Sequence, residues 1–318
     1  MRILVTGGSG FIGSHLVSTL IKTDNDVIVI DSLISSTTEF IDLYIQSGKC
    51  LFIKGDIRDQ KLLNSFTPPI DFIFHLAADP DVKTSVEFPL NSFEHNVRGT
   101  LNVLELARRS DIKGLFFASS GGTLYGDVEE FPIEENTVLS PISPYGASKA
   151  ACEMYAAAYA NTYQIKIVAG RLANIIGERS SHGVCYDFYK KLIRNPGELT
   201  ILGDGLQKKS YLHVSDCIDA IMALCDNLNK QQDWYDYFNL GSDEWVSVKK
   251  IAEIIENEMN LNGVHHKFTG GKKGWAGDVH KMLLSNKKIK KITGWSPSLT
   301  TKKAIQIYIS WLKSRDLE

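Results

Sequence analysis

A tyrosine and a lysine stand four positions apart in Pro144-Tyr145-Gly146-Ala147-Ser148-Lys149. Residues at i and i+4 share one face of a helix, so the phenol and the ammonium would point the same way. A phenol with an ordinary pKa of about 10 is a poor base at neutral pH. A nearby cation favours its ionised form and lowers that pKa. The pair Tyr145 and Lys149 therefore predicts a phenol that can act as a base.

A second Tyr-x-x-x-Lys match occurs at Tyr186 and Lys190. The first pair is preferred because it follows Ser119-Ser120 and the fifth predicted strand. We expect the second pair to be an ordinary helix surface.

The glycine-rich stretch Thr6-Gly7-Gly8-Ser9-Gly10-Phe11-Ile12-Gly13 follows the first apolar run of the chain and opens a helix. Its glycines fit both G-x-G-x-x-G and the variant G-x-x-G-x-x-G. This spacing allows a tight turn, a close approach of the backbone to a pyrophosphate, and tight packing of helix on strand. The start of the helix adds free N–H groups and a partial positive charge. Dinucleotide binding is predicted for Gly7, Gly10, Phe11, Ile12 and Gly13.

Asp31 ends the second apolar run, 18 residues after Gly13. A carboxylate at this place accepts hydrogen bonds from the adenosine-ribose hydroxyls and repels a 2′-phosphate, which favours NAD over NADP. No arginine within 32–38 reverses that preference. Ser32 and Leu33 are included in the predicted cofactor site.

Asp56 and Ile57 follow the third apolar run, where they could lie beside the adenine. The alternative is that Asp56 caps the helix predicted over 58–66.

The elements that must position these residues are short strands that alternate with helices. Nearly all-apolar runs occur at 3–6, 27–31, 51–54, 72–76, 115–119 and 165–171. Such runs are typical of strands in a parallel sheet that is covered on both faces. Amphipathic segments at 12–22, 90–109 and 145–163 separate some of them. The alternation predicts an α/β fold, a Rossmann-type doubly wound parallel sheet.

The rhythm changes beyond about residue 174, where glycine and polar residues interrupt the chain. Helical segments are predicted at 216–227, 248–261 and 301–313. We expect an NAD-binding Rossmann domain over 1–173 and a smaller α-rich substrate lobe over 174–318. The part from about 210 to 242 is expected to return to the first domain, with a strand at 238–240.

Composition excludes several classes of protein. The 318 residues include 35 lysines and arginines and 37 aspartates and glutamates, a net charge of −2. This balance argues against nucleic-acid or polybasic membrane partners. No apolar stretch approaches the roughly 18 residues of a membrane helix. Met1-Arg2 runs directly into an apolar strand, so we expect no signal peptide. The five scattered cysteines predict reduced thiols in the cytoplasm and no metal site.

Taken in order, these motifs resemble the extended short-chain dehydrogenase/reductase superfamily, in its nucleotide-sugar epimerase/dehydratase branch. The resemblance is greatest to UDP-glucose 4-epimerases of the archaeal type. It covers nearly the whole chain, in TGGSGFIG at 6–13, Asp31, HLAAD at 75–79, Asn96, SSGGTLYG at 119–126, YGASK at 145–149, RLANIIG at 171–177, GDGLQKKSYLHVSD at 203–216 and WAGDV at 275–279.

The resemblance implies a tightly bound NAD and inversion at carbon 4 of a UDP-hexose through a 4-keto sugar. Tyr145 would take the proton of the 4-hydroxyl while carbon 4 gives up a hydride. Lys149 would tune Tyr145 and hold the nicotinamide ribose. Asn96 would bind backbone or water near the cofactor. A homodimer through the helices at 90–109 and 145–163 is also implied. Further cofactor contacts would come from Leu76, Ala77, Ala78, Ser119 and Leu172.

Three positions depart from the family pattern. The catalytic serine or threonine of the family usually stands where this chain has Gly121. Ser120 or Thr123 could supply the hydroxyl, or Tyr145 could act alone; we favour Ser120, with Thr123 as a substrate contact. Lys209 and Trp275 stand where related epimerases carry phosphate-binding arginines. The substrate contacts implied on this side are Lys209, Lys273, Asp278, Asn174, Gly183 and Val184.

Other functions stay open at this point. Relatives that dehydrate nucleotide sugars carry acidic groups where this chain has Gly122 and Thr123, which disfavours a 4,6-dehydratase. A nucleotide-sugar reductase is another alternative. A non-catalytic dinucleotide sensor is a third, although such relatives tend to lose the tyrosine–lysine pair that this chain keeps.

Overall fold

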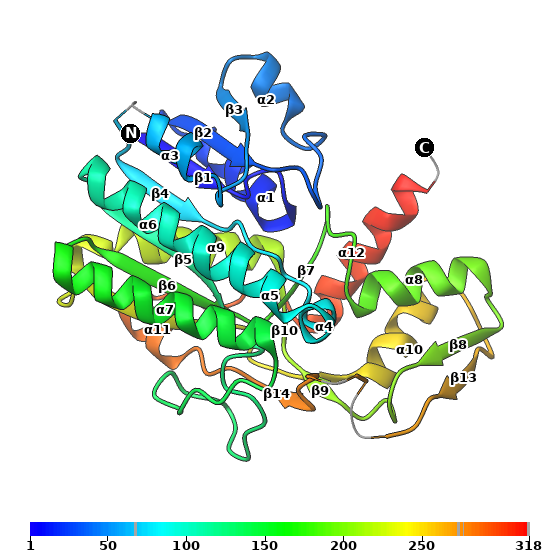
Figure 1. Cartoon of the computed structure of the whole chain (residues 1–318). Helices are drawn as coiled ribbons and strands as arrows, with labels where there is room; N and C mark the ends of the chain where they lie inside the picture. Colours follow the sequence, from blue (N-terminus) through cyan, green and yellow to red (C-terminus); the bar gives the residue numbers. More distant parts are fainter. Residues whose placement is uncertain (67–68, 272–273, 276, 317–318) are drawn as a thin grey trace.

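The computed structural model describes residues 1–66, 69–271, 274–275 and 277–316. At its centre lies a seven-stranded parallel sheet of order β11-β6-β5-β4-β1-β2-β3 (Figure 1). The Rossmann-type fold is thereby confirmed. Its strands are β1 (Arg2–Thr6), β2 (Asp26–Asp31), β3 (Cys50–Lys54), β4 (Phe72–His75), β5 (Gly114–Ser120), β6 (Ile167–Leu172) and β11 (Tyr235–Leu240).

Two hydrophobic cores cover the two faces of this sheet. One joins alternate strand residues to α1 (Phe11–Leu20), α9 (Val214–Asp226) and α11 (Lys287–Thr293). The other joins the intervening residues to α3 (Gln60–Ser65), α6 (Gly99–Ser110) and α7 (Pro144–Tyr163). Because strand side chains alternate between faces, a strand buried on both sides must be apolar at nearly every position. The six apolar runs therefore predicted six of these strands to within two residues, whereas β11 begins three residues before the strand expected at 238–240.

A third core joins helices from the second half of the chain. It is built from α8 (Val184–Arg194), β8 (Glu198–Ile201), α10 (Val248–Glu258) and α12 (Thr301–Arg315). Small sheets lie outside the central one: β7 (Asn174–Ile176) pairs with β10 (Tyr211–His213), β8 pairs with β13 (His265–Phe268), and β9 (Lys208–Lys209) pairs with β12 (Val246–Ser247) and β14 (Lys281–Met282). Figure 1 shows α8, α10 and β8 together at one end of the molecule.

The segment predicted as one helix over 90–109 differs from that prediction. It is divided into α5 (Pro89–Ser92), a π-helical turn η1 (Phe93–Arg98) and α6. The π-helical turn contains the buried Asn96, and such turns often occur at functional sites. Periodicity alone does not distinguish it from α-helix. The remaining elements are α2 (Asp42–Gln46), α4 (Val82–Glu87) and η2 (Leu228–Lys230). None of the helices in the described ranges has the length and apolar character needed to cross a bilayer.

Candidate active site

Tyr145 and Lys149 lie in the first two turns of α7. The helix begins with Pro144 after the N-cap Ser143, whose hydroxyl accepts a hydrogen bond of 3.1 Å from Gly146 N. Proline at the first helical position and serine at the cap are both typical of a helix start. Both predicted catalytic side chains are buried, with exposed fractions of 9% for Tyr145 and 4% for Lys149. The start of α7 thus places Tyr145 and Lys149 on one buried face of the helix.

The ammonium of Lys149 is close to the phenol ring. Its Nζ lies 6.0 Å from the Tyr145 ring centroid and donates a hydrogen bond of 2.9 Å to Ala118 O. Burial lowers the pKa of Lys149, while the charge of Glu153 opposes this shift. An ammonium has three donors, so Lys149 retains capacity for ligand hydroxyls.

Burial dominates the acidity of Tyr145. It raises the pKa of this phenol to about 12, and a side-chain interaction with Ser120 acts in the opposite direction. The protein by itself therefore keeps the phenol neutral at neutral pH. Additional positive charge at the ring is needed before Tyr145 can act as a base.

Ser120 is the predicted hydroxyl that the structure places at the phenol. Thr123 Oγ1 donates to Ser120 Oγ at 2.9 Å, so both residues belong to one group. A Cβ at Gly121 would lie 2.5 Å from Leu284 Cδ1 and 3.0 Å from Arg171 O. A side chain at 121 would therefore collide with the core, which explains why the hydroxyl expected there is absent. The catalytic role of Ser120 stays a prediction.

The glycine loop is packed too closely for side chains. Gly7 has φ +72°, and a Cβ on it would lie 2.7 Å from Ala77 N. A Cβ on Gly13 would lie 2.1 Å from Gly7 O. Gly10 differs, because the single atom within 4 Å of its added Cβ is Gly7 O at 3.3 Å. The outer side of Gly10 is thus open for a ligand to approach its backbone.

Asp31 joins the glycine loop to the loop after β2. Its carboxylate accepts hydrogen bonds from Ser9 N, Leu33 N and Ser36 Oγ, each at 3.0 Å. An ionised carboxylate has about four acceptor positions, so one remains for a ligand hydroxyl. The prediction that Asp31 receives both ribose hydroxyls would require one of these protein donors to move. Ser32 and Leu33 lie beside it, half-buried.

Asn96, for which the resemblance implied a contact with backbone or water near the cofactor, holds the loop that follows β4. Its side chain accepts from Asp79 N at 2.8 Å and donates to Asp79 O at 3.2 Å and to Ser148 Oγ at 2.9 Å. At the other end of this loop, Leu76 N donates to Thr6 O at 3.1 Å. The predicted cofactor residues Leu76, Ala77 and Ala78 are thus fixed between the glycine loop and α7.

Asp56 is engaged by Arg58 and does not cap a helix. The guanidinium lies 2.6 Å from Asp56 Oδ2, and it holds the pKa of that carboxyl below its usual value. The cap of α3 is Asp59, which accepts from Lys61 N and Leu62 N. The capping alternative for Asp56 is therefore wrong. Ile57 is buried, and its Cδ1 would lie 2.6 Å from a Cβ added to Gly99.

These groups fit a bound NAD. The open backbone at Gly10 and the start of α1 suit a pyrophosphate, since helix N-termini bind anions. The unused acceptor of Asp31 suits a ribose hydroxyl, and the remaining donors of Lys149 suit another. Within the described part of the chain, buried Ser9 Oγ has no hydrogen-bond partner. The predicted residue Leu172 is buried at the end of β6.

Two predicted substrate residues bind each other. Lys209 Nζ and Asp278 Oδ1 form an ion pair of 2.5 Å, and Gly274 N donates to Asp278 Oδ2 at 3.1 Å. Lys209 Nζ also lies 5.4 Å from the Trp275 ring centroid. The predicted phosphate-binding cation is thus already paired with a carboxylate. Lys273 lies outside the described residues.

The segment around Asp278 reaches the helix that carries the tyrosine. A Cβ on Gly277 would lie 3.2 Å from Ser143 Cβ, just before Tyr145. Asn174 Nδ2 donates to Ser210 O at 3.3 Å, next to Lys209. The predicted residue Gly183 is the N-cap of α8 with φ +89°, and Val184 is its first residue. The ring of the neighbouring His182 lies edge-on, 6.4 Å from that of Phe11 in the glycine loop.

Comparison with known proteins decides the family. Residues 3–241 match the model of the NAD dependent epimerase/dehydratase family. The chain belongs to this family. A Methanocaldococcus jannaschii protein, provisionally named a UDP-glucose 4-epimerase, is 35% identical over 323 residues, 99% of each chain.

Two solved structures extend the comparison. The UDP-glucose 4-epimerase of Thermotoga maritima, solved with UDP-glucose, has a TM-score of 0.90 at 31% identity and full coverage of both chains. The dTDP-glucose 4,6-dehydratase of Streptomyces venezuelae, solved with NAD, has a TM-score of 0.91 at 26% identity, covering 99% of this chain and 97% of that one. Both branches of the family thus share this fold.

Sequence reasoning missed two buried charged residues of this family member. Glu153 lies on α7 and Arg171 on β6, and their side chains form an ion pair of 2.7 Å. Ser119, predicted near the nicotinamide, donates its hydroxyl to Glu153 Oε1. One signal was available, since Glu153 follows Lys149 by the same four-residue step that separates Lys149 from Tyr145.

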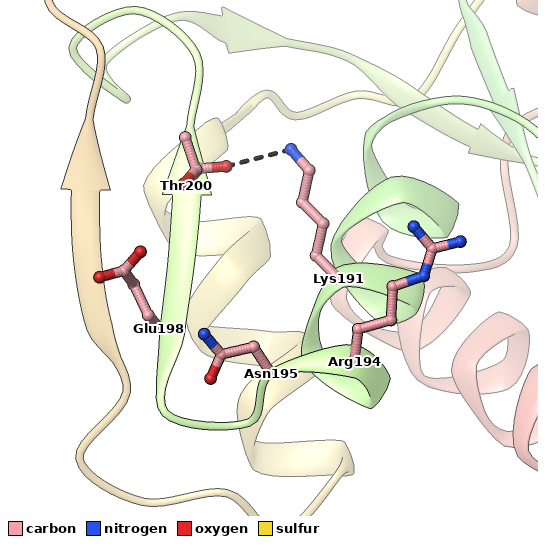
Figure 2. A pocket seen from close by; sticks show the side chains of 5 residues that line it. All are labelled: Lys191, Arg194, Asn195, Glu198 and Thr200. Atoms are coloured by element: carbon pink, nitrogen blue, oxygen red, sulfur yellow. Dashed lines mark hydrogen bonds between the residues drawn. The ribbon is translucent and has the colours of Figure 1, made fainter.

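A surface hollow of about 210 Å³ lies elsewhere (Figure 2). It is lined by Lys191, Arg194, Asn195, Glu198 and Thr200. Lys191 and Arg194 are in the last turns of α8, whereas Val184 begins that helix. At about 1.5 Å per residue, the hollow is on the order of 10–15 Å from Val184 along the helix. We do not assign the reaction to it. Among the described residues, histidines, cysteines and carboxylates form no cluster of three that could hold a metal ion.

Proposed function

We propose that this NAD-dependent enzyme inverts carbon 4 of a UDP-hexose, either UDP-glucose and UDP-galactose or their N-acetyl forms, through a 4-keto sugar. The observation that carries the proposal is the buried face of α7 that holds Tyr145 and Lys149, with the half-buried Ser120 at the phenol. This face provides one proton carrier and no carboxylate at positions 122 and 123. Inversion at one carbon needs one proton carrier and one reversible hydride acceptor.

The protein residues act on the proton of the sugar hydroxyl. NAD, when bound, supplies the reversible hydride acceptor for carbon 4. Tyr145 takes the hydroxyl proton as a phenolate and returns it after the keto sugar has presented its other face. Lys149, 6.0 Å from the ring centroid, would stabilise the phenolate through its charge. Ser120, which interacts with the phenol, would align the sugar hydroxyl. Burial of this face excludes water that would otherwise solvate the phenolate.

The nucleotide part of the substrate would be held by the second half of the chain. Lys209 would bind the diphosphate while keeping its contact with Asp278, which would also accept a ribose hydroxyl. Lysine binds phosphate as a point charge without the bidentate fork of arginine. Asn174 would contact the diphosphate or sugar, and Gly183 and Val184 would lie along the uracil.

A 4,6-dehydratase is the competing assignment within the family, and the likeness to the Streptomyces enzyme gives it weight. That reaction also removes a proton at carbon 5 and expels a hydroxyl at carbon 6, so it needs further acid and base groups. Gly122 has no side chain, and the Thr123 hydroxyl already bonds to Ser120. The epimerase assignment fits these positions better.

We also propose that the enzyme forms a homodimer in the cytoplasm. Exposed apolar side chains gather on adjacent helices, with exposed fractions of 77% for Leu90, 52% for Phe93 and 56% for Met154. A second copy could cover them. Light scattering that shows a monomer would reject this proposal.

The experiment that tests the function uses a panel of UDP-hexoses. The protein is incubated with each sugar nucleotide without added cofactor, and the products are resolved by chromatography and NMR. The epimerase assignment predicts galacto- and gluco-isomers in equilibrium. Accumulation of a 4-keto-6-deoxy sugar would favour the dehydratase. Net consumption of NADH in a parallel incubation to which NADH is added would favour a reductase.

A further inference from the structure

The ion pair of Glu153 and Arg171 lies inside the molecule between α7 and β6. The exposed fractions are 0% for the Glu153 side chain and 3% for that of Arg171. The guanidinium Nη2 lies 2.7 Å from Oε2, and Nε lies 3.0 Å from Oε1. Replacing such a pair with apolar residues is often neutral or stabilising, because burying two charges is costly. Stability alone therefore does not account for this pair.

On one side, the pair reaches the catalytic group. Ser119 Oγ donates to Glu153 Oε1 at 2.5 Å. Ser119 directly precedes Ser120, whose hydroxyl faces the phenol of Tyr145. The Glu153 carboxylate consequently fixes the end of β5 at the residue before the predicted catalytic hydroxyl. Its charge also opposes the lowering of the Lys149 pKa by burial.

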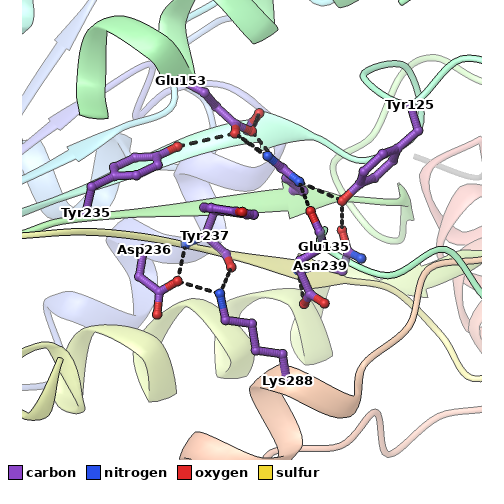
Figure 3. A network of polar contacts seen from close by, with 10 residues as sticks. Tyr125, Glu135, Glu153, Tyr235, Asp236, Tyr237, Asn239 and Lys288 are labelled. Carbon is purple, nitrogen blue, oxygen red and sulfur yellow. Dashed lines mark hydrogen bonds and ion pairs between the residues drawn. The ribbon is translucent and has the colours of Figure 1, made fainter. Parts of the chain in front are cut away.

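On the other side, the pair reaches the segment that carries Thr123. Arg171 Nη1 donates to Tyr125 OH at 2.8 Å and to Glu135 O at 3.0 Å. Tyr125 OH then donates to Asn239 Oδ1 at 2.8 Å. Figure 3 shows these side chains around one buried centre, with Glu153 on one side and Tyr125 on the other. A single ion pair thus connects β5, α7 and the 121–139 segment.

We propose that Glu153 is a positioning residue for the proton transfer. Held by Arg171, it fixes Ser119 and the 121–139 segment so that Ser120 and Thr123 stay against Tyr145. The expected effect of Glu153 on turnover rests on the proposed function. Its expected effect on the structure of the 121–139 segment does not. Displacing reacting groups by about 1 Å costs roughly 100-fold in rate.

The chain offers a matched control for this carboxylate. Tyr235 OH donates to Glu153 Oε2 at 3.3 Å from β11, away from Ser119. Tyr235→Phe therefore removes one hydroxyl from the same carboxylate without touching the site. Glu153→Gln removes the charge and forces an amide N–H₂ toward either Arg171 or Ser119.

For Glu153→Gln we expect kcat per bound NAD to fall roughly 10- to 100-fold with KM changed less than about threefold. Tyr235→Phe should leave both constants unchanged. Equal constants for Glu153→Gln and the wild type, at equal NAD content, would overturn the proposal. If Glu153→Gln does not fold, Ser119→Ala tests the proposal instead. It removes the hydrogen bond from Ser119 to Glu153 and leaves the ion pair of Glu153 and Arg171 intact. Ser119→Ala should lose at least about fivefold in kcat at an unchanged melting temperature, and full kcat would overturn the proposal.

A second readout needs neither substrate nor cofactor. Amide hydrogen exchange is measured for the 121–125 region, where Leu124 N donates to Ser120 O and Ser140 N to Leu124 O. Glu153→Gln should speed exchange there roughly tenfold or more, while Tyr235→Phe should not. Unchanged protection in Glu153→Gln would overturn the proposal. If the wild type inverts no UDP-hexose but exchange responds as expected, the proposed function fails and the positioning role stands.

Discussion

Replacing Lys149 with methionine tests how the buried phenol of Tyr145 becomes a base. The change keeps the length and apolar character of the side chain and removes its charge. In the wild type the ammonium lies 6.0 Å from the ring centroid. With the delocalised phenolate charge placed at the ring centroid and an effective dielectric constant of about 20, the two unit charges interact by about 3 kcal/mol. This corresponds to about two pKa units.

The sign of the shift follows from the charges. A positive neighbour stabilises the phenolate, so removing it raises the pKa of Tyr145. Burial has already raised that pKa to about 12 in the protein alone, and bound NAD, with its positive nicotinamide, must lower it for activity. In Lys149→Met, the rise of rate with pH should therefore move about two pH units higher. Activity at neutral pH should fall roughly 100-fold and recover in part under alkaline conditions.

The assay is the pH dependence of the first-order rate, expressed per bound NAD because Lys149 also faces the predicted cofactor site. Lys190→Met is the matched control, since its Nζ lies 5.8 Å from the Tyr186 ring on the surface of α8. That variant should keep the wild-type profile, and Tyr145→Phe should be inactive at every pH. A Lys149→Met profile with an unmoved rise would refute the electrostatic reasoning.

Three further predictions concern the cofactor and the fold. Gly13→Ala should abolish NAD retention, measured by chromatography of the purified protein, because the new Cβ would lie 2.1 Å from the carbonyl oxygen of Gly7. Gly197→Ala is the control and should retain NAD, because its Cβ would meet a single atom at 3.7 Å. Asp31→Asn should weaken NAD roughly 10- to 100-fold in calorimetry and improve NADP, because a charged acceptor is lost; unchanged preference would exclude this role. The His213 side chain, 3.3 Å away, lowers the pKa of Glu178 from 4.5 to about 2. The contact of Glu178 with His213 therefore contributes to stability above pH about 4.5, and this contribution is lost as the pH falls toward about 2. Glu178→Gln should make the free energy of unfolding depend less on pH between these values. An equally steep decrease of the free energy of unfolding in the variant would contradict this.

The sequence predicted the sheet well because its strands are buried on both faces. Each of the six runs from 3–6 to 165–171 became a strand of the central sheet. The π-helical turn Phe93–Arg98 was not predicted, since its side-chain periodicity differs little from that of the flanking helix. Helix α11 also packs on the sheet, through Ile289, although the sequence placed it in the second lobe. Short amphipathic helices carry no information about which core they will join.

The predicted site was less complete, because its polar contacts join distant parts of the chain. Lys209 and Asp278 lie 69 positions apart, so their pairing has no local sequence signal. Ser119 was expected at the nicotinamide, but its hydroxyl turns to Glu153. Periodic motifs reveal residues that share one helix face, such as Tyr145 and Lys149. They do not reveal a partner that comes from another element.

The proposed inversion requires carbon 4 to lose and regain the same hydrogen within one active site. UDP-glucose and UDP-N-acetylglucosamine, each carrying deuterium at carbon 4 of the sugar, are incubated in ordinary water, and the products are analysed by NMR and mass spectrometry. We predict a galacto-product from at least one of them that keeps its deuterium at carbon 4. Products that lose the label to water, or no inverted product from either substrate, would contradict the account.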